Sequence, residues 1–174
     1  AAKLDGAGYF KPANQRYPAL NQMGMVTAAV WTDLDGDRYP ELIVAGDWEP
    51  VHIFKNTAGK LSLQATVHGN AATSGGGWWN CIAMADLDGD GDPDFVLGNQ
   101  GLNSRFKAGA KQPLQLYVND FDQNGRDETI LCQYNGSESY PVVMRNDLVK
   151  QLPVLKKKYL KFNDYKNQAI TQVF

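Results

Sequence analysis

The stretch Asp86-Leu87-Asp88-Gly89-Asp90-Gly91-Asp92-Pro93-Asp94 decides how the rest of the chain must be organised. It carries carboxylates at alternate positions, and these would repel one another strongly without a cation among them. The two glycines allow the tight backbone curl that brings the carboxylates together. A strand-like run, Phe95-Val96-Leu97-Gly98, follows directly. The stretch therefore predicts a calcium loop that leads into a β-strand.

Two related windows, residues 33–41 and 120–128, show that the motif is repeated. The pentapeptide Asp-Leu-Asp-Gly-Asp is identical at positions 33 and 86, and the three windows hold four, five and four of the 19 acidic residues. The net charge is only −2, so the chain outside the windows is basic. This distribution argues against a generally acidic surface that solubilises the protein or mimics DNA.

In each window we expect oxygen ligands at positions 1, 3, 5, 7 and 9, with a backbone carbonyl at position 7 where the side chain is not acidic. The expected metal ligands are Asp33, Asp35, Asp37, the Tyr39 carbonyl and Glu41; Asp86, Asp88, Asp90, Asp92 and Asp94; and Asp120, Asp122, Asn124, the Arg126 carbonyl and Glu128. Ligation by oxygen alone, without Cys or His, favours calcium over magnesium or manganese.

The loops are not EF-hands, because an EF-hand has a bidentate Glu at its twelfth position and flanking helices. The twelfth residues here are Val44, Leu97 and Leu131, each in a β-rich run. The third window offers only three carboxylates at its ligand positions, because Asn124 replaces one, and should bind more weakly. The first has Arg38 where the others have glycine, so the central window is the strongest candidate. Two alternatives stay open: the windows are only Asp- and Gly-rich turns, or the metal is purely structural.

The hydrophobic pattern predicts a mainly β chain with a helical end. Residues 1–24 are expected to be irregular, 25–67 to form a four-stranded antiparallel unit, and 75–144 to form a second unit and the start of a third. Residues 145–174 predict two or three short helices. Asp147 is expected to cap the first, Pro153 to begin the second and Asp164 to cap a third running towards Phe174. One apolar face is expected to pack on the sheets through Leu148, Leu152, Leu155, Tyr159 and Phe162.

Residues 32–46 and 85–99 resemble the FG-GAP, or VCBS, repeats of integrin-α-like β-propellers. The segments 24–31, 77–80, 98–106 and 140–143 look like secreted Bacteroidetes members of that family, which often carry an ASPIC/UnbV region. The resemblance implies four-stranded blades, calcium between the first two strands of a blade, a helical insertion after Arg145 and an extracytoplasmic location: secreted, periplasmic or at the outer-membrane surface.

The expected fold is therefore a partial β-propeller of about two and a half to three blades with a C-terminal helical insertion. A complete propeller has about 4 to 8 blades, so we expect the chain to be a piece of a larger propeller protein. An open arc exposes sheet edges, which predicts self-association, capping by the chain's own helices, or poor stability.

The favoured function is non-catalytic binding or scaffolding of a glycan or protein partner. Trp31, Trp48, Trp78 and Trp79 can stack on sugars, although blade packing is the commoner role for such residues. The alternative is an enzyme acting on polysaccharide, a lyase or hydrolase, but no nucleophile motif accompanies the only two histidines, His52 and His68.

A nucleic-acid partner, a membrane span and a disulfide framework have little support in the sequence. The single run at residues 156–158 is too short for a nucleic-acid surface, and no apolar run approaches the ~20 residues of a membrane span. Two cysteines, Cys81 and Cys132, are too few for a disulfide framework, although a single bridge between them stays open.

Overall fold

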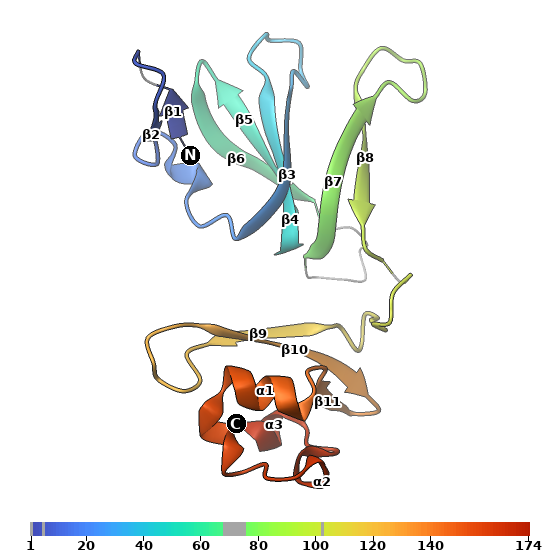
Figure 1. Cartoon of the computed structure of the whole chain (residues 1–174). Coiled ribbons are helices and arrows are strands. Elements are labelled where there is room, and N and C mark those ends of the chain that lie inside the picture. The colour runs from blue at the N-terminus through green and yellow to red at the C-terminus, as the bar shows by residue number, and fades with distance from the viewer. Residues whose placement is uncertain (1, 5, 68–75, 102) are drawn as a thin grey trace. The chain divides into compact units, whose positions relative to one another are not determined.

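The computed structural model describes residues 2–4, 6–67, 76–101 and 103–174. Strands make up 43% of the described residues and helices 14%, so the prediction of a mainly β protein is confirmed. The chain divides into two compact units, residues 1–101 (unit 1) and 102–174 (unit 2), which are described separately (Figure 1). The division falls inside the range 75–144, where the sequence predicts the second blade and the start of a third.

Unit 1 is an antiparallel sheet with a small two-stranded ribbon before it (Figure 1). The ribbon and a 3-10 turn show that the N-terminal segment is not wholly irregular. The elements of unit 1 are β1 (Ala2–Leu4), β2 (Phe10–Pro12), η1 (Pro18–Leu20), β3 (Met25–Thr32), β4 (Glu41–Glu49), β5 (Val51–Thr57), β6 (Lys60–Val67), β7 (Gly77–Ala85) and β8 (Asp94–Asn99).

Strand β4 is the centre of unit 1 because both of its faces are buried. Ile43 and Ala45 belong to one hydrophobic cluster, and Leu42 and Val44 belong to another together with Phe54 of β5. This alternation follows from the two-residue period of a strand. A strand that is covered on both faces has a nearly continuous apolar sequence, which is why this run was predictable as a strand.

Strands β3 to β6 follow one another as an antiparallel meander, while β7 pairs with both β8 and the end of β4. The pairing of β4 with β7 is irregular around Trp48, whose φ is +63°. The rings of Trp48 and Trp78 meet edge to face with their centroids 5.2 Å apart. The described strands form open sheets without a closed ring, so the number of blades stays a prediction.

Unit 2 joins a three-stranded antiparallel sheet to a group of short helices (Figure 1). Its strands are β9 (Gln115–Asn119), β10 (Glu128–Asn135) and β11 (Glu138–Pro141), and its helices are α1 (Arg145–Gln151), η2 (Pro153–Lys156), α2 (Phe162–Tyr165) and α3 (Ile170–Val173). Within the described part of the chain, none of the helices has the length and apolar character that a membrane crossing requires.

The helices of unit 2 pack on β10 through one hydrophobic core. Ile130 and Cys132 of β10 are fully buried and share this core with residues from α1, η2 and α3. Four of the five apolar residues predicted to face the sheet are buried, but Phe162 is 63% exposed. The prediction for Phe162 was wrong because the helical period breaks before it: a turn follows η2, and α2 begins anew at Phe162.

The predicted helix starts need two corrections. Met144 is the N-cap of α1, so Asp147 lies inside the first turn, where its charge favours the helix N-terminus. Pro153 begins η2 as expected. The carboxylate of Asp164 accepts a hydrogen bond from the Lys161 N–H at 2.7 Å and so closes the start of α2. However, α2 ends at Tyr165, and a separate helix, α3, covers the last residues.

Candidate metal centres

Each acidic window lies in the hairpin between two antiparallel strands. Loop 1 (residues 33–41) joins β3 to β4, loop 2 (86–94) joins β7 to β8, and loop 3 (120–128) joins β9 to β10. The twelfth position of each window falls within the following strand, as the sequence predicts. The loops therefore share one structural context in two separate units.

The aspartate at position 1 of each loop organises the backbone in the same way. In loop 2 the Asp86 carboxylate accepts hydrogen bonds from the Gly89 N–H at 2.7 Å and from the Gly91 N–H at 3.0 Å. Asp33 and Asp120 accept the same pair of bonds at 2.8–2.9 Å, except that loop 3 uses the N–H at position 5 in place of position 4. One carboxylate thus folds each loop around itself.

The carboxylate at position 9 closes each loop onto its own beginning. Glu41, Asp94 and Glu128 accept hydrogen bonds from the N–H at position 2 at 2.9, 2.9 and 3.0 Å. The side-chain oxygen at position 5 also accepts from the N–H at position 7 in all three loops. The repeated side-chain types therefore have a structural reason that does not depend on an ion.

Positions 4 and 6 adopt positive φ in all three loops. Loop 2 uses Gly89 and Gly91 there, whereas loop 1 has Arg38 with φ +69° and loop 3 has Gln123 with φ +60°. Residues other than glycine are strained in this conformation. Only loop 2 therefore meets the backbone requirement with glycine at both positions.

Three groups of acidic residues can each hold a cation, because within each group the side-chain oxygens lie within 4.8 Å of one another. The groups are Asp33, Asp35 and Asp37; Asp86, Asp88 and Asp90; and Asp120, Asp122 and Glu128. Glu41, Asp92 and Asp94 are not members of these groups. The predicted ligand oxygens of Tyr39, Asn124 and Arg126 lie in the same loops and stay predictions.

Loop 3 contains a buried carboxylate oxygen that lacks a partner among the described residues, while its weaker binding relative to the other loops stays a prediction. Asp122 Oδ1 is inaccessible to solvent and accepts no hydrogen bond from the residues that the structure describes. A buried carboxylate oxygen in that state is costly unless a positive charge compensates it. Asp120 and Glu128 supply the neighbouring oxygens, and Glu128 is itself only 9% exposed.

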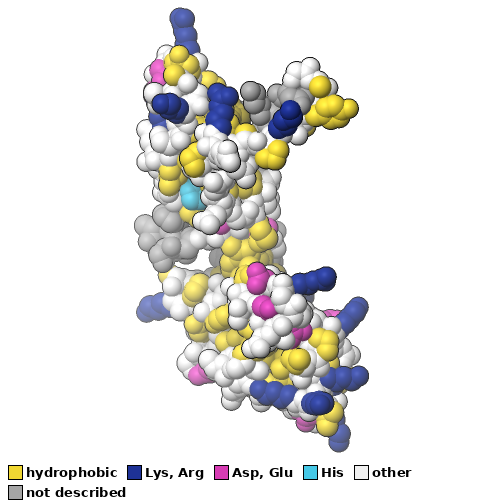
Figure 2. Space-filling view, turned by 90° about the vertical axis from the view of Figure 1, so that its left-hand side faces the viewer, with side chains coloured by type: hydrophobic (Ala, Val, Ile, Leu, Met, Phe, Trp, Pro, Cys, Tyr) yellow, Lys and Arg dark blue, Asp and Glu magenta, His cyan; other side chains and the backbone are white. Residues whose placement is uncertain are grey.

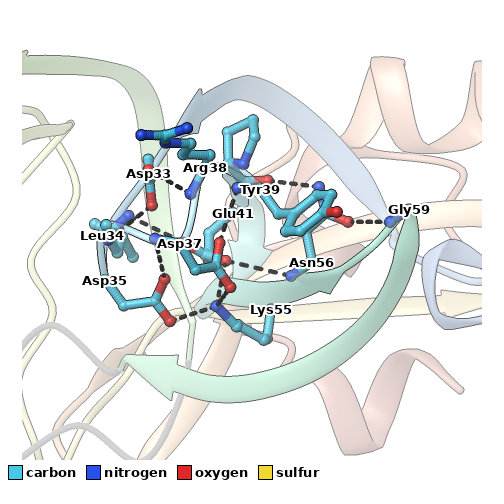
Figure 3. A network of polar contacts seen from close by, with 12 residues as sticks. Asp33, Leu34, Asp35, Asp37, Arg38, Tyr39, Glu41, Lys55, Asn56 and Gly59 are labelled. Atoms are coloured by element: carbon cyan, nitrogen blue, oxygen red, sulfur yellow. Dashed lines mark hydrogen bonds and ion pairs between the residues drawn. The ribbon is translucent and has the colours of Figure 1, made fainter.

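Loop 1 is contacted by a residue of another strand that sequence reasoning missed. Lys55 of β5 contacts three carboxylates with its ammonium: that of Asp35, that of Asp37 at 2.7 Å and that of Glu41 at 3.2 Å (Figure 3). The hydrogen bonds that the ammonium donates to Asp35 and then to Asp37 raise the pKa of Lys55. The Lys55 hydrogen bond lowers the pKa of Asp37, with help from the Tyr39 N–H. The signal that could have revealed Lys55 is strand register, since the pair Leu42↔Phe54 puts Lys55 opposite Glu41.

The other candidate residues have separate roles. Trp79 is buried in the core of unit 1, whereas Trp31 is 51% exposed. His52 Nε2 lies 3.6 Å from a Glu49 carboxylate oxygen, and His68 lies outside the described residues. Cys81 and Cys132 are both free thiols. Lysine and arginine side chains are scattered among acidic and apolar ones on the face that Figure 2 shows.

Comparison with known families agrees with this geometry. Residues 33–97 match the family model described as an FG-GAP-like repeat. This FG-GAP-like segment contains loops 1 and 2 and the strands between them, while loop 3 and the helices lie beyond it. No curated protein matches the chain in sequence, and no solved structure matches it. The FG-GAP resemblance is thus supported over this segment.

Proposed function

We propose that this chain is a calcium-stabilised β-propeller-type module outside the cytoplasm that binds or scaffolds a glycan or protein partner without catalysis. The observation that carries the calcium part is the grouping of Asp120, Asp122 and Glu128, in which a buried carboxylate oxygen has no hydrogen-bond partner among the described residues. The FG-GAP-like segment and the shared geometry of the three loops support the same conclusion.

Calcium is the ion that suits this donor set. The loops offer only oxygen ligands, several of them charged, on a backbone that curls tightly at positions 4 and 6. Hard cations prefer such ligands, and calcium accepts irregular geometries that magnesium does not. When bound, the ion neutralises the clustered carboxylates and holds the two strands of the hairpin together. The carboxylates at positions 1 and 9 already hold each loop in shape before an ion binds, because they accept backbone hydrogen bonds.

A calorimetric titration of chelator-stripped protein with calcium tests this proposal. We expect heat from bound calcium and a raised melting temperature in millimolar calcium. Asp88→Asn and Asp122→Asn should each weaken binding at their own loop, and the exposed Asp147→Asn of α1 is the matched control outside the loops. Absence of heat and of any shift would show that the loops are only hydrogen-bonded turns.

The location follows from the affinity that such sites have. Extracellular calcium modules bind at about 0.1 to 1 mM, a concentration of free calcium that the cytosol does not supply. A weak site of this kind is filled only outside the cytoplasm. Fractionation of cells that express the natural protein tests the proposal, and a cytoplasmic pool holding all of the protein would contradict it.

The partner is proposed to bind at the loop end of unit 1. Trp31 at the end of β3 is 51% exposed and Tyr39 of loop 1 is 46% exposed, so both rings are available to stack on a sugar or an apolar side chain. A glycan array with wild type and Trp31→Ala tests this role, with melting curves as the control for folding. Binding that is lost in Trp31→Ala supports the proposal, while release of a cleaved product would favour the enzyme alternative.

No observation favours the enzyme alternative at present. Two hollows of about 430 Å³ each lie in unit 2, one lined by residues including Tyr134, Tyr140 and Gln168, the other by residues including Met144 and Phe162. Neither is lined by an aspartate, glutamate or histidine. Glycoside hydrolysis uses a pair of carboxyl groups beside the bond that breaks, and these hollows do not offer one.

A further inference from the structure

Loop 1 differs from the other two loops because the ammonium group of a lysine lies among its carboxylates. The Lys55 ammonium contacts Asp35, Asp37 and Glu41, whose carboxylates come from positions 3, 5 and 9 of the loop (Figure 3). These are oxygens that a metal ion in this loop would need. The ammonium therefore lies where it competes directly with a bound ion.

The fold, and not chance rotation of a long side chain, brings Lys55 to this place. Phe54 is buried in one hydrophobic cluster with Leu42 and Val44 of β4, and the antiparallel register pairs it with Leu42. The next residue along β5 is therefore opposite Glu41, which is only 1% exposed. The Lys55 side chain is itself 22% exposed, so loop and sheet enclose most of it.

In unit 2 the residue that corresponds to Lys55 in strand register does not contact the acidic loop. The register Cys132↔Pro141 between β10 and β11, continued towards loop 3, would set Arg145 opposite Glu128. However, β11 ends at Pro141, and Arg145 begins α1. Its guanidinium donates instead to the backbone carbonyls of Tyr159 and Leu160. No lysine or arginine of the described residues therefore forms an ion pair with the loop 3 carboxylates, in agreement with the unpartnered Asp122 oxygen.

In the part of the chain that the structure describes, the carboxylates of loop 2 also have no cationic side chain paired with them. Strand β8 is the last strand of its sheet in the part of the chain that the structure describes, so no further strand stands where β5 stands in loop 1. Among the described residues, no lysine or arginine forms an ion pair with a carboxylate of loop 2 or loop 3. The ion pairs of loop 1 are thus a specific property of that loop.

We infer that Lys55 is the built-in cation of loop 1, so that loop 1 stays closed without metal and only loops 2 and 3 take calcium. The inference rests on the proposed function for loops 2 and 3, but its own content concerns loop 1. Removing the ammonium while keeping the length of the side chain leaves the same carboxylates without a counter-charge. Lys55→Met therefore converts loop 1 into a third calcium site.

The test counts calcium ions in the full chain by calorimetry after chelator treatment. Wild type should bind two ions and Lys55→Met three, while Lys55→Arg and the exposed Lys60→Met on the same hairpin should stay at two. In chelator, Lys55→Met should melt at a lower temperature than Lys60→Met, and saturating calcium should restore much of the difference. Three ions in wild type with no gain in Lys55→Met would overturn the inference and leave the proposed function intact.

A second set of variants keeps the test decisive if Lys55→Met fails to fold. Asp35→Asn should leave the count at two, because loop 1 holds no ion in wild type, while Asp88→Asn should lower it to one. A count that falls in Asp35→Asn would overturn the inference. A wild type that binds no calcium would sink the proposed function for loops 2 and 3. In that case, a gain of one ion in Lys55→Met would still support the inference about Lys55, and no gain would overturn it.

Discussion

Loop 1 and loop 3 share a hydrogen-bond plan but differ in how their negative charge is balanced. In both loops the aspartate at position 1 accepts two backbone N–H groups and the glutamate at position 9 closes the loop. Loop 1 then receives the ammonium of Lys55, whereas Asp122 Oδ1 of loop 3 is buried without a partner among the described residues. The loop's own residues thus determine its shape, and a neighbouring strand determines its cation.

The largest expected effect comes from removing the glutamate that closes loop 1. Glu41→Ala takes a buried acceptor from the Leu34 N–H and a counter-charge from Lys55, so we expect a loss of about 3 kcal/mol in the free energy of unfolding. The loss should be the same in chelator and in calcium. Urea unfolding in both conditions measures it, with the exposed Glu138→Ala as control. A loss that appears only in calcium would mean that loop 1 holds an ion.

The existence of the loops could be predicted because their residues are local. Position 1 and position 9 lie eight residues apart, and the glycines and following apolar runs are visible in one window of sequence. Lys55 could not be found in this way, because its contact depends on the register between β4 and β5. A one-residue slip in that register would have pointed Lys55 to the opposite face of the sheet.

The alkaline pH dependence of stability reports on the core of unit 2 and not on loop 3. Burial raises the pKa of the Cys132 thiol to about 11, from an ordinary value of 9.0. The folded unit therefore keeps a proton that the unfolded chain releases, so this contribution to stability is complete below pH 9 and is lost as pH rises to about 11. We expect a decline of roughly 2 to 3 kcal/mol across that window, measured by urea unfolding in chelator.

The exposed cysteine supplies the matched comparison for that pH dependence. Cys132→Ala should have a lower stability at neutral pH but should lack the part of the alkaline decline that is due to the thiol, whereas Cys81→Ala should keep it. An unchanged decline in Cys132→Ala would show that other groups, such as Tyr165, whose pKa burial raises to about 12, dominate the alkaline loss.

The effect of Asp122→Asn on the stability of unit 2 should change sign when calcium is added. In chelator it removes the charge of a buried, unpartnered oxygen and should stabilise unit 2 by about 1 kcal/mol. In saturating calcium it removes a ligand and should destabilise by about 1 to 2 kcal/mol, because the stabilisation depends on affinity. Thermal melts in both conditions measure the two signs. Asp127→Asn, at an exposed position of the same loop, should show no such reversal, and an Asp122→Asn effect of one sign only would break the comparison.

The smallest expected effects come from backbone strain. Arg38→Gly in loop 1 and Gln123→Gly in loop 3 should each stabilise by about 0.5 to 1 kcal/mol, because both residues have positive φ. Gly91→Ala in loop 2 should destabilise by about 1 kcal/mol, although no heavy atom lies within 4 Å of the added methyl group. Urea unfolding measures all three, and a stabilising Gly91→Ala would contradict the assignment of strain to φ.

The helical end was predictable in its packing but not in its boundaries. Leu148, Leu152 and Leu155 recur at helical spacing and are buried, because the apolar face must cover β10. The break before Phe162 is set by how the short helices turn across the sheet. Helix pieces of four residues have little stability of their own, so tertiary contacts decide where they begin and end.

Hydrogen exchange at the amide of position 6 in each loop tests the central claim most directly. Arg38, Gly91 and Gly125 all donate their N–H to the carboxylate at position 1, so they report on loop closure in the same way. Calcium should slow exchange at Gly91 and Gly125 by tenfold or more, and should leave Arg38 protected equally with and without calcium. Equal slowing at all three amides would contradict a lysine-closed loop 1, and no slowing at any of them would contradict calcium binding.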